Sequence, residues 1–199
     1  MRSHAHGQGY ADLHFLIPEV LKTVEVYKGP YFAEYGDFAT GGAVQLVTRD
    51  VFEENFLKLN GGYFDTSEVL FLLSPTKERL KTMFAFNYFF TNGPFFNDQK
   101  FDRYHFFTKA SLEIDPKQRL SLWASGYEGD WNASGQIPRR AVKDGRLNWF
   151  GAIDPTEGGD SSRYNFNLLY RYDISKTQKL KFGAWASYYD LDLFSNFTF

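Results

Sequence analysis

Much of the chain alternates between apolar and polar residues with a period of two. The clearest stretch is Arg103 to Ile114, where one set of alternate positions holds Tyr, Phe, Thr, Ala, Leu and Ile. The other set holds Arg, His, Phe, Lys, Ser and Glu. Successive side chains of a β-strand point to opposite faces, so this pattern predicts a long strand with one apolar face. Related patterns occur over residues 84–90, 119–126, 164–173 and 179–188, and in weaker form over 55–63 and 68–74. The sequence therefore predicts seven strands.

The connections between these strands alternate in length. Those near residues 75–81, 115–118 and 175–178 are short, those over 91–102 and 128–163 are long, and only 64–67 departs from this order. Outer-membrane barrels have short periplasmic turns and long extracellular loops. A half-buried soluble sheet also alternates, but the apolar faces of the five better strands carry no charge. The pattern favours a mainly β fold, a partial transmembrane antiparallel β-barrel.

The first fifty residues have a different pattern. Thr23–Tyr27 and Ala43–Thr48 are rich in β-branched residues and predict two short strands. Ile17–Glu19 is expected to open a short helix, with Pro at a tolerated early position. Tyr31–Tyr35 is expected to form a helical turn, which Gly36 closes with a positive φ. The unit is a small α/β piece punctuated by glycines.

The spacing of residues in this unit resembles the second half of the plug domain of TonB-dependent receptors. The matching positions, within residues 15–49, are Glu25, Gly29, Pro30, Tyr35, Gly36, Gly41, Gly42 and Thr48. Gln45 stands where the family usually has Asn. The resemblance implies that residues 1–50 are the C-terminal part of a plug domain. Residues 51–199 would then be the N-terminal strands of the β-barrel, about seven strands of a larger, plugged barrel.

The resemblance also implies a function and partners. Members of this family take up a scarce ligand, such as a ferric siderophore or another metal chelate, across the bacterial outer membrane. Their partners are the lipid bilayer, the small-molecule ligand and a TonB-type periplasmic energy-coupling protein. The segment that this protein grips, the first half of the plug and a signal peptide are not recognisable in the sequence. The chain is therefore expected to be a fragment of a receptor.

The composition agrees with a membrane barrel. Aromatic residues make up 20% of the chain, with 22 Phe and 13 Tyr, although the mean hydropathy is −0.42. Transmembrane barrels need lipid-facing aromatic residues and girdles at both interfaces. A net charge of −2 argues against a nucleic-acid partner. The alternative is a soluble all-β ligand-binding or carbohydrate-binding module that uses exposed aromatic residues.

Candidate chemical residues are few. His4 and His6 place two imidazoles on one side of an extended segment, with His14 further along, but only Asp12 lies near to complete a metal site. A metal is therefore not expected. A polar role in a plug loop is the favoured interpretation, and contact with the ligand is the alternative, because plug loops face the binding chamber in the family that the sequence resembles. Trp131 and Trp149, in the long segment 128–163, are candidate ligand contacts because binding residues concentrate on loops. No catalytic constellation is present, so neither enzyme activity nor a cofactor is expected.

Cations recur on the polar faces of the predicted strands. They either steer anionic ligands through the barrel or pair with carboxylates of the plug and of neighbouring strands, such as Glu113 and Asp173. Pairing is the favoured interpretation. The cations are Arg103, Lys109, Arg119, Arg171 and Lys181.

Overall fold

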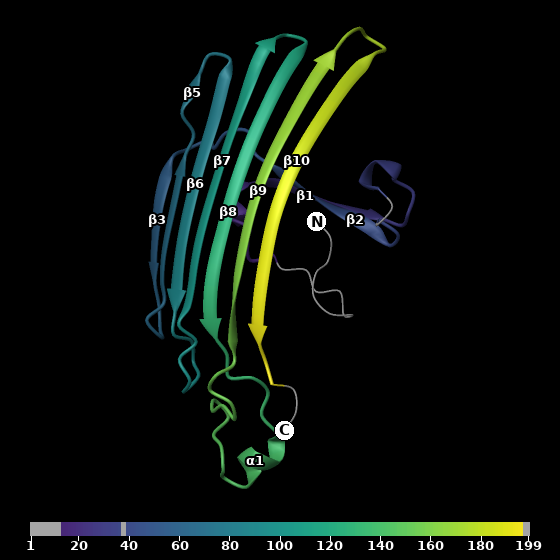
Figure 1. Ribbon diagram of the computed structural model, residues 1–199. Coiled ribbons are helices and arrows are strands. Elements are labelled where there is room, and N and C mark those ends of the chain that lie inside the picture. Colours follow the sequence, from purple (N-terminus) through teal and green to yellow (C-terminus); the bar gives the residue numbers. More distant parts are fainter. Residues whose placement is uncertain (1–12, 37–38, 197–199) are drawn as a thin grey trace.

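The computed structural model describes residues 13–36 and 39–196 of the chain. They form two antiparallel sheets, one of two strands and one of eight. Figure 1 shows the larger sheet as a curved wall of long strands, with the smaller sheet on one side of it. We call the described part of residues 13–49 the N-terminal unit. The wall face that it contacts is the inner face, and the opposite face is the outer face.

The N-terminal unit contains the elements that the sequence predicts. They are η1 (Pro18–Val20), β1 (Leu21–Lys28), η2 (Ala33–Tyr35) and β2 (Gly42–Thr48). Both helical elements are single 3-10 turns, and Gly36 follows the second with φ of 76°. β1 and β2 pair antiparallel, with Val26 opposite Val44. This small sheet leads directly into the wall.

The wall consists of seven long strands and one short one. They are β3 (Phe56–Gly61), β4 (Ser67–Leu73), β5 (Thr76–Lys77), β6 (Leu80–Thr91), β7 (Phe101–Asp115), β8 (Gln118–Asn132), β9 (Gly158–Asp173) and β10 (Lys179–Phe194). The order is β10-β9-β8-β7-β6-β4-β3, and the two-residue β5 pairs with β6. Each long strand thus lies beside its neighbour in sequence. The expected fold class, an open antiparallel barrel wall of about seven strands, is confirmed.

Short turns lie at one end of the wall and long loops at the other, except that the short β3–β4 turn over residues 62–66 lies at the long-loop end (Figure 1). The longest loop contains α1 (Arg139–Lys143), which the sequence pattern did not predict. Three strands extend further towards the long-loop end than expected, over residues 127–132, 158–163 and 189–194. These extensions contain Gly, Asp and Ser, which favour strands poorly. They are strands because the register of β8, β9 and β10 continues without interruption to their ends.

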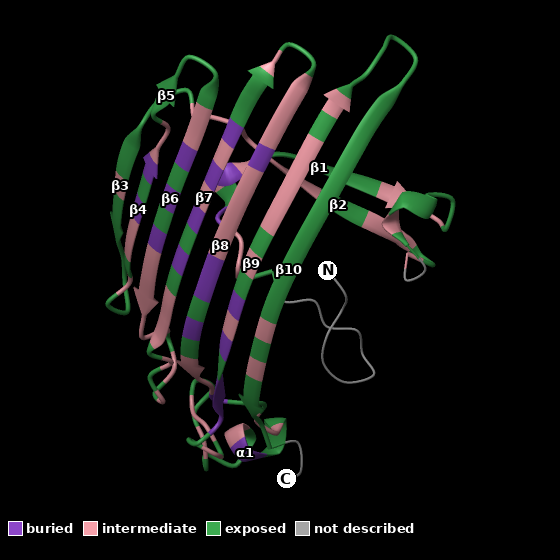
Figure 2. Cartoon of the chain, turned by 45° about the horizontal axis from the view of Figure 1, so that its top comes forward, coloured by how far each residue is buried: buried purple, intermediate pink, exposed green. Residues whose placement is uncertain are grey.

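The two faces of the wall differ as the alternation predicts. The outer-face side chains of Tyr104, Phe166 and Phe182 are 47%, 51% and 57% exposed, so these rings are not in a closed interior. In Figure 2, β6, β7 and β8 carry bands of buried residues, whereas β10 is almost wholly exposed. The N-terminal unit therefore covers only part of the inner face.

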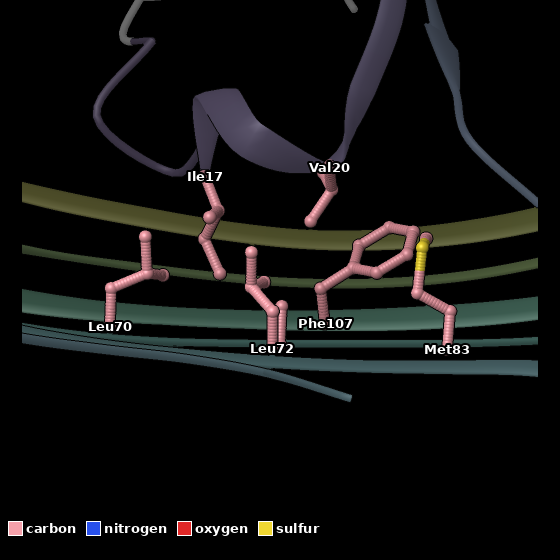
Figure 3. Packing of buried hydrophobic residues seen from close by; sticks show 7 residues of the cluster. Ile17, Val20, Leu70, Leu72, Met83 and Phe107 are labelled. Atoms are coloured by element: carbon pink, nitrogen blue, oxygen red, sulfur yellow. The ribbon is translucent and has the colours of Figure 1, made fainter. Parts of the chain in front are cut away.

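A hydrophobic cluster joins the N-terminal unit to the wall (Figure 3). Ile17, just before η1, and Val20, its last residue, contact inner-face residues of β4, β6 and β7. Those residues are Leu70, Leu72, Met83, Ala85 and Phe107. The inner face is thus apolar here, although cations recur on it elsewhere. Residues 69–73 and 83–86 are continuous apolar runs because this patch is apolar on the inner face as well as on the outer face, where Phe71, Phe84 and Phe86 are exposed.

Candidate functional site

Charged and hydrogen-bonding side chains form networks on the inner face, where the N-terminal unit meets the wall. Just beyond β2, the Asp50 carboxylate binds two wall cations: its Oδ1 lies 2.9 Å from Lys109 Nζ and its Oδ2 lies 2.7 Å from Arg119. Lys109 Nζ also donates to Thr48 Oγ1 and to the Arg49 carbonyl, each at 3.0 Å. We call these four side chains, Thr48, Asp50, Lys109 and Arg119, the ionic clasp. It fixes the chain where it passes from the small sheet to the wall.

The clasp compensates a buried charge. The Lys109 side chain is only 9% exposed, and a buried ammonium is tolerated only when it is paired and hydrogen-bonded. Burial alone raises the pKa of Asp50, but hydrogen bonds from Lys109 and Arg119 outweigh it and hold that pKa below its usual value. Asp50 therefore stays ionised at neutral pH. The two ion pairs of Asp50 thus hold the chain in position where it passes from β2 to the wall.

A second polar network lies on the inner face of the first strands. Glu68 of β4 accepts hydrogen bonds from Asn60 at 2.6 Å and from Asn87 at 3.0 Å. Lys58 joins this carboxylate at 3.5 Å and also reaches Glu19 of η1 at 3.7 Å. The network extends to β7, where an Arg103 guanidinium nitrogen donates to Asn87 Oδ1 at 3.2 Å. The N-terminal unit is thus held by charges as well as by the hydrophobic cluster.

Aromatic contacts continue the interface towards the long-loop end. The Arg163 guanidinium lies 4.4 Å from the centre of the Phe15 ring, close enough for a cation–π contact. Phe101 contacts both His14 and Trp131, with ring centres 6.2 and 6.5 Å apart. The predicted site residue Trp131 therefore lies in the wall beside the N-terminal unit, not at the tip of a loop.

The residues that carry the plug resemblance have structural roles in the N-terminal unit. Gly42 closes the hairpin where a Cβ would stand 2.2 Å from the Tyr27 carbonyl oxygen. Tyr35 donates a hydrogen bond to Gln45 at 2.7 Å.

Glu25 accepts a hydrogen bond from the Tyr27 hydroxyl, which raises the pKa of that tyrosine. Gly29 donates its N–H to the Gly41 carbonyl at 3.0 Å, with Pro30 next along the chain. Thr48 belongs to the ionic clasp.

The two longest loops are joined to each other. Asn97 donates to the carbonyls of Ala133 at 3.0 Å and Pro155 at 3.3 Å. The Phe96 N–H donates to the Phe150 carbonyl at 3.0 Å. The predicted contact Trp149 lies on this surface and is 65% exposed. The loops thus form one surface with exposed aromatic rings, which suits contact with a ligand.

Other predicted residues have mixed outcomes. His4 and His6 lie outside the described residues, and His14 is the member of the histidine group that the structure describes.

Within the described ranges no group of three or more His, Cys, Asp or Glu side chains is placed to hold a metal ion. In the same ranges, no helix is long and apolar enough to cross a membrane.

The five inner-face cations do not share one role. Two of them, Lys109 and Arg119, pair with a carboxylate of the N-terminal segment, as the favoured interpretation predicted. The two carboxylates that were named as partners bind other lysines: Glu113 binds Lys81 at 3.2 Å and Asp173 binds Lys179 at 3.6 Å. That choice of partners was wrong, because Lys81, just before the strand expected over 84–90, and Lys179, at the start of the strand expected over 179–188, pair with these carboxylates instead.

The outer face is divided into bands along the strands. Towards the long loops it carries two pairs of directly opposed tyrosines. Tyr88 and Tyr104 lie on β6 and β7, and Tyr164 and Tyr188 lie on β9 and β10. Beyond them four aspartates lie directly opposite one another across β7, β8, β9 and β10: Asp102, Asp130, Asp160 and Asp192. On β9, Tyr164 and Tyr172 bound a stretch whose intervening outer residues are uncharged. Eight residues span about 26 Å of strand, or about 20 Å across a bilayer at a tilt near 40°.

Solved structures with the same architecture are siderophore receptors. The siderophore receptor PiuA from Acinetobacter baumannii matches with a TM-score of 0.71 and 13% identity, over 87% of this chain and 26% of that chain. The siderophore receptor PirA from the same organism matches with a TM-score of 0.63 and 20% identity, over 90% and 29%. A mutant of the ferric enterobactin receptor PfeA from Pseudomonas aeruginosa matches with a TM-score of 0.58 and 16% identity, over 92% and 29%. No protein-family model and no curated protein matches the sequence.

These matches define the class of fold. At such identities the likeness concerns the fold alone, and the chain spans about a quarter of the length of these receptors. The expected resemblance to TonB-dependent receptors is confirmed at this level. The chain has the fold of part of a siderophore-receptor barrel wall with a small N-terminal unit on its inner face.

Proposed function

We propose that the chain is part of a TonB-dependent receptor of the bacterial outer membrane, which takes up a scarce ligand such as a ferric siderophore or another metal chelate. Residues 1–50 belong to the plug in this proposal, and residues 51–199 are the first strands of the barrel. The observation that carries it is the banded outer face: uncharged and ring-bearing between its tyrosines, and acidic beyond them. Such a face suits hydrocarbon flanked by two interfaces.

The same proposal assigns the two ends of the wall. The joined long loops, with Trp149 exposed, face the exterior and contact the ligand, as does Trp131 at the top of the inner face. His4 and His6 are proposed to contact the ligand from the plug side. The short turns face the periplasm, where a TonB-type protein acts on a segment outside these residues. The chain carries no catalytic role and no cofactor in this proposal.

The soluble all-β module is the less favoured function. It would leave large apolar side chains of the outer face in water, among them Phe106 at 46% and Phe166 at 51% exposure. Large apolar side chains exposed together on one face mark contact with another phase or partner.

Quenching by brominated lipids tests the membrane assignment. Phe166→Trp places an indole on the outer face, and Asn167→Trp places one at the next position of β9, on the inner face. In liposomes whose acyl chains carry bromine at mid-depth, the Phe166→Trp fluorescence should fall strongly and the added Asn167→Trp fluorescence should be nearly unaffected. Equal quenching of both would contradict the proposed orientation.

Uptake tests the ligand assignment. In cells that depend on the receptor, replacing residues 139–150 by a short Gly/Ser linker should abolish growth on the ferric chelate while leaving the protein in the outer membrane. Growth that is unchanged would argue against the proposed ligand surface.

A further inference from the structure

The outer face ends in an apolar belt on the side of the short turns. One row of directly opposed residues runs there from β5 to β10. Directly opposed residues share a face of the sheet, and this row lies on the outer face because Phe182 belongs to it. Its members are Lys77, Leu80, Leu112, Leu120, Tyr170 and Phe182. Apart from the lysine, the row therefore presents aliphatic and aromatic side chains.

A lysine lies at each of the three short turns that border this belt. Lys77 ends β5 directly opposite Leu80, Lys117 lies between β7 and β8, and Lys176 lies between β9 and β10. All three are exposed. Successive turns are two strand spacings apart, so their tips lie about 10 Å from one another along one rim (Figure 1). We call these three residues the lysine rim.

The carboxylates near the lysine rim do not pair with it. Asp115 accepts two hydrogen bonds from its own turn, at 2.8 and 2.6 Å. Asp173 binds Lys179 at 3.6 Å. Glu78 is flanked by a cation on either side, so its turn is still cationic. Within the part of the chain that the structure describes, the ammonium groups of the lysine rim form no ion pair.

The opposite boundary of the outer face carries the opposite charge. Beyond the tyrosines lie the four directly opposed aspartates of β7, β8, β9 and β10. The neighbouring row adds Glu128 and Asp190, which face each other across Ser162. An anionic headgroup is repelled by this boundary and attracted by the lysine rim. The two boundaries of the apolar surface thus differ in the lipid headgroups that they suit.

We propose that the lysine rim binds the phosphate groups of anionic phospholipids, whose acyl chains lie against the apolar belt. A lysine stem packs along apolar surface while its ammonium stays at the polar boundary. Lysines close to an anionic membrane surface are attracted to it within a Debye length. The inference rests on the proposed membrane function and adds to it the class of lipid that the short-turn boundary selects.

Lipid-selective quenching tests the proposal. Leu180→Trp places an indole on the outer face beside the lysine rim, and Tyr188→Trp places one near the acidic rows. The full 199-residue chain is reconstituted in equal parts of phosphatidylcholine and phosphatidylglycerol, with bromine on the acyl chains of one lipid at a time. The added fluorescence gives the ratio of the two lipids around each indole.

Near Leu180→Trp the ratio of phosphatidylglycerol to phosphatidylcholine should exceed the bulk ratio about fivefold, the factor expected from the attraction of one lysine to an anionic surface. Near Tyr188→Trp it should equal the bulk ratio or fall below it. Because the Debye length is about 3 Å at 1 M salt, the enrichment should disappear in sodium chloride of about that concentration. A bulk ratio at Leu180→Trp in low salt would overturn the proposal, and so would equal enrichment at both indoles.

Triple variants identify the residues. In the Leu180→Trp chain, Lys77→Gln/Lys117→Gln/Lys176→Gln should return the lipid ratio to the bulk value. The matched control, Lys22→Gln/Lys28→Gln/Lys100→Gln, removes the same charge from exposed positions away from the rim and should leave the enrichment unchanged. Equal effects of the two triples would refute the site.

Two further measurements separate this inference from its alternatives. Sodium phosphate should reduce the enrichment no more than sodium chloride of equal ionic strength does, and a larger effect would replace the lipid with a free anion. Quenching of Phe166→Trp by brominated phosphatidylcholine, without enrichment at Leu180→Trp, would refute lipid selection and leave the membrane assignment standing. Absence of quenching at Phe166→Trp would refute the membrane assignment itself.

Discussion

The ring of Phe106 lies across the backbone of Gly126 on the outer face of the wall. The two residues are directly opposed on β7 and β8, and a Cβ at position 126 would stand 2.1 Å from Cε1 of the ring. Glycine in a strand interior often marks such a close approach. The ring covers backbone that would otherwise be exposed on the outer face, so the pair acts as one packing unit.

Gly126→Ala should therefore destabilise the wall by about 1–3 kcal/mol, the usual cost of overpacking. In a Phe106→Ala background the added methyl meets no ring, so most of this cost should disappear. Urea unfolding in detergent micelles, arranged as a double-mutant cycle, should give a coupling free energy of about 0.5–3 kcal/mol. A coupling near zero would show that the ring and the glycine do not depend on each other.

Charge placed on the outer face should be far more costly than charge placed on the inner face. Phe166→Arg should lower the free energy of unfolding in liposomes by about 2–4 kcal/mol if the residue lies near the bilayer midplane. Asn167→Arg, at the next position of β9, should cost much less because it faces the polar side. Lys109 is unsuitable as the inner-face control because it holds Asp50. Similar losses for both substitutions would favour a soluble sheet.

The sequence predicted the strands whose two faces differ strongly. Over Arg103–Ile114 and 164–173 the period of two is unambiguous, because the outer-face positions are uncharged and the inner-face positions are mostly polar. The hairpin turn at 115–118 was equally clear from its Asp and Pro. The small sheet was predictable because β-branched runs alternate there with glycines.

Other features depend on neighbours that are distant in sequence. Nothing local to Asp50 shows that it will meet Lys109 and Arg119. The extension over 158–163 has poor strand propensity and forms only because β8 and β10 supply partners on both sides. The apolar patch under η1 did leave a signal, the continuous apolar run of 69–73, which alternation alone does not explain.

Removing the carboxylate of the ionic clasp should loosen the N-terminal unit. Asp50→Asn leaves the buried Lys109 ammonium without its counterion. Breaking a fully buried pair costs about 3–5 kcal/mol, but Asp50 is 41% exposed, so we expect about 1–2 kcal/mol. Trypsin cleavage within residues 22–49 should become faster, whereas Glu53→Gln, at an exposed position nearby, should leave the rate unchanged. Identical cleavage rates in both variants would show that the clasp does not anchor the unit.

The clasp should also give stability a defined pH dependence. The pKa of Asp50 is lower in the folded chain than in the unfolded chain, so its contribution is fully present above the unfolded value, near 4. It is lost as the pH falls through the lower, folded value. Unfolding measured from pH 7 to pH 2.5 should therefore show a loss of stability below about pH 4 that is smaller in Asp50→Asn. An unchanged pH profile in that variant would assign the acid sensitivity to other carboxylates.

Asn97 should control whether the two long loops move as one. Its amide donates to two carbonyls of the longer loop, those of Ala133 and Pro155, so Asn97→Ala leaves both without this donor. The loss of two hydrogen bonds costs about 1–3 kcal/mol, enough to raise loop opening by roughly 5- to 150-fold. Hydrogen exchange of residues 133–157 should become correspondingly faster, while exchange in β7 and β8 below the loops should not change. Gln136→Ala, at an exposed position of the same loop, is the matched control and should leave exchange unaltered. If Asn97→Ala behaves like that control, the loops are held together by the Phe96–Phe150 contact instead.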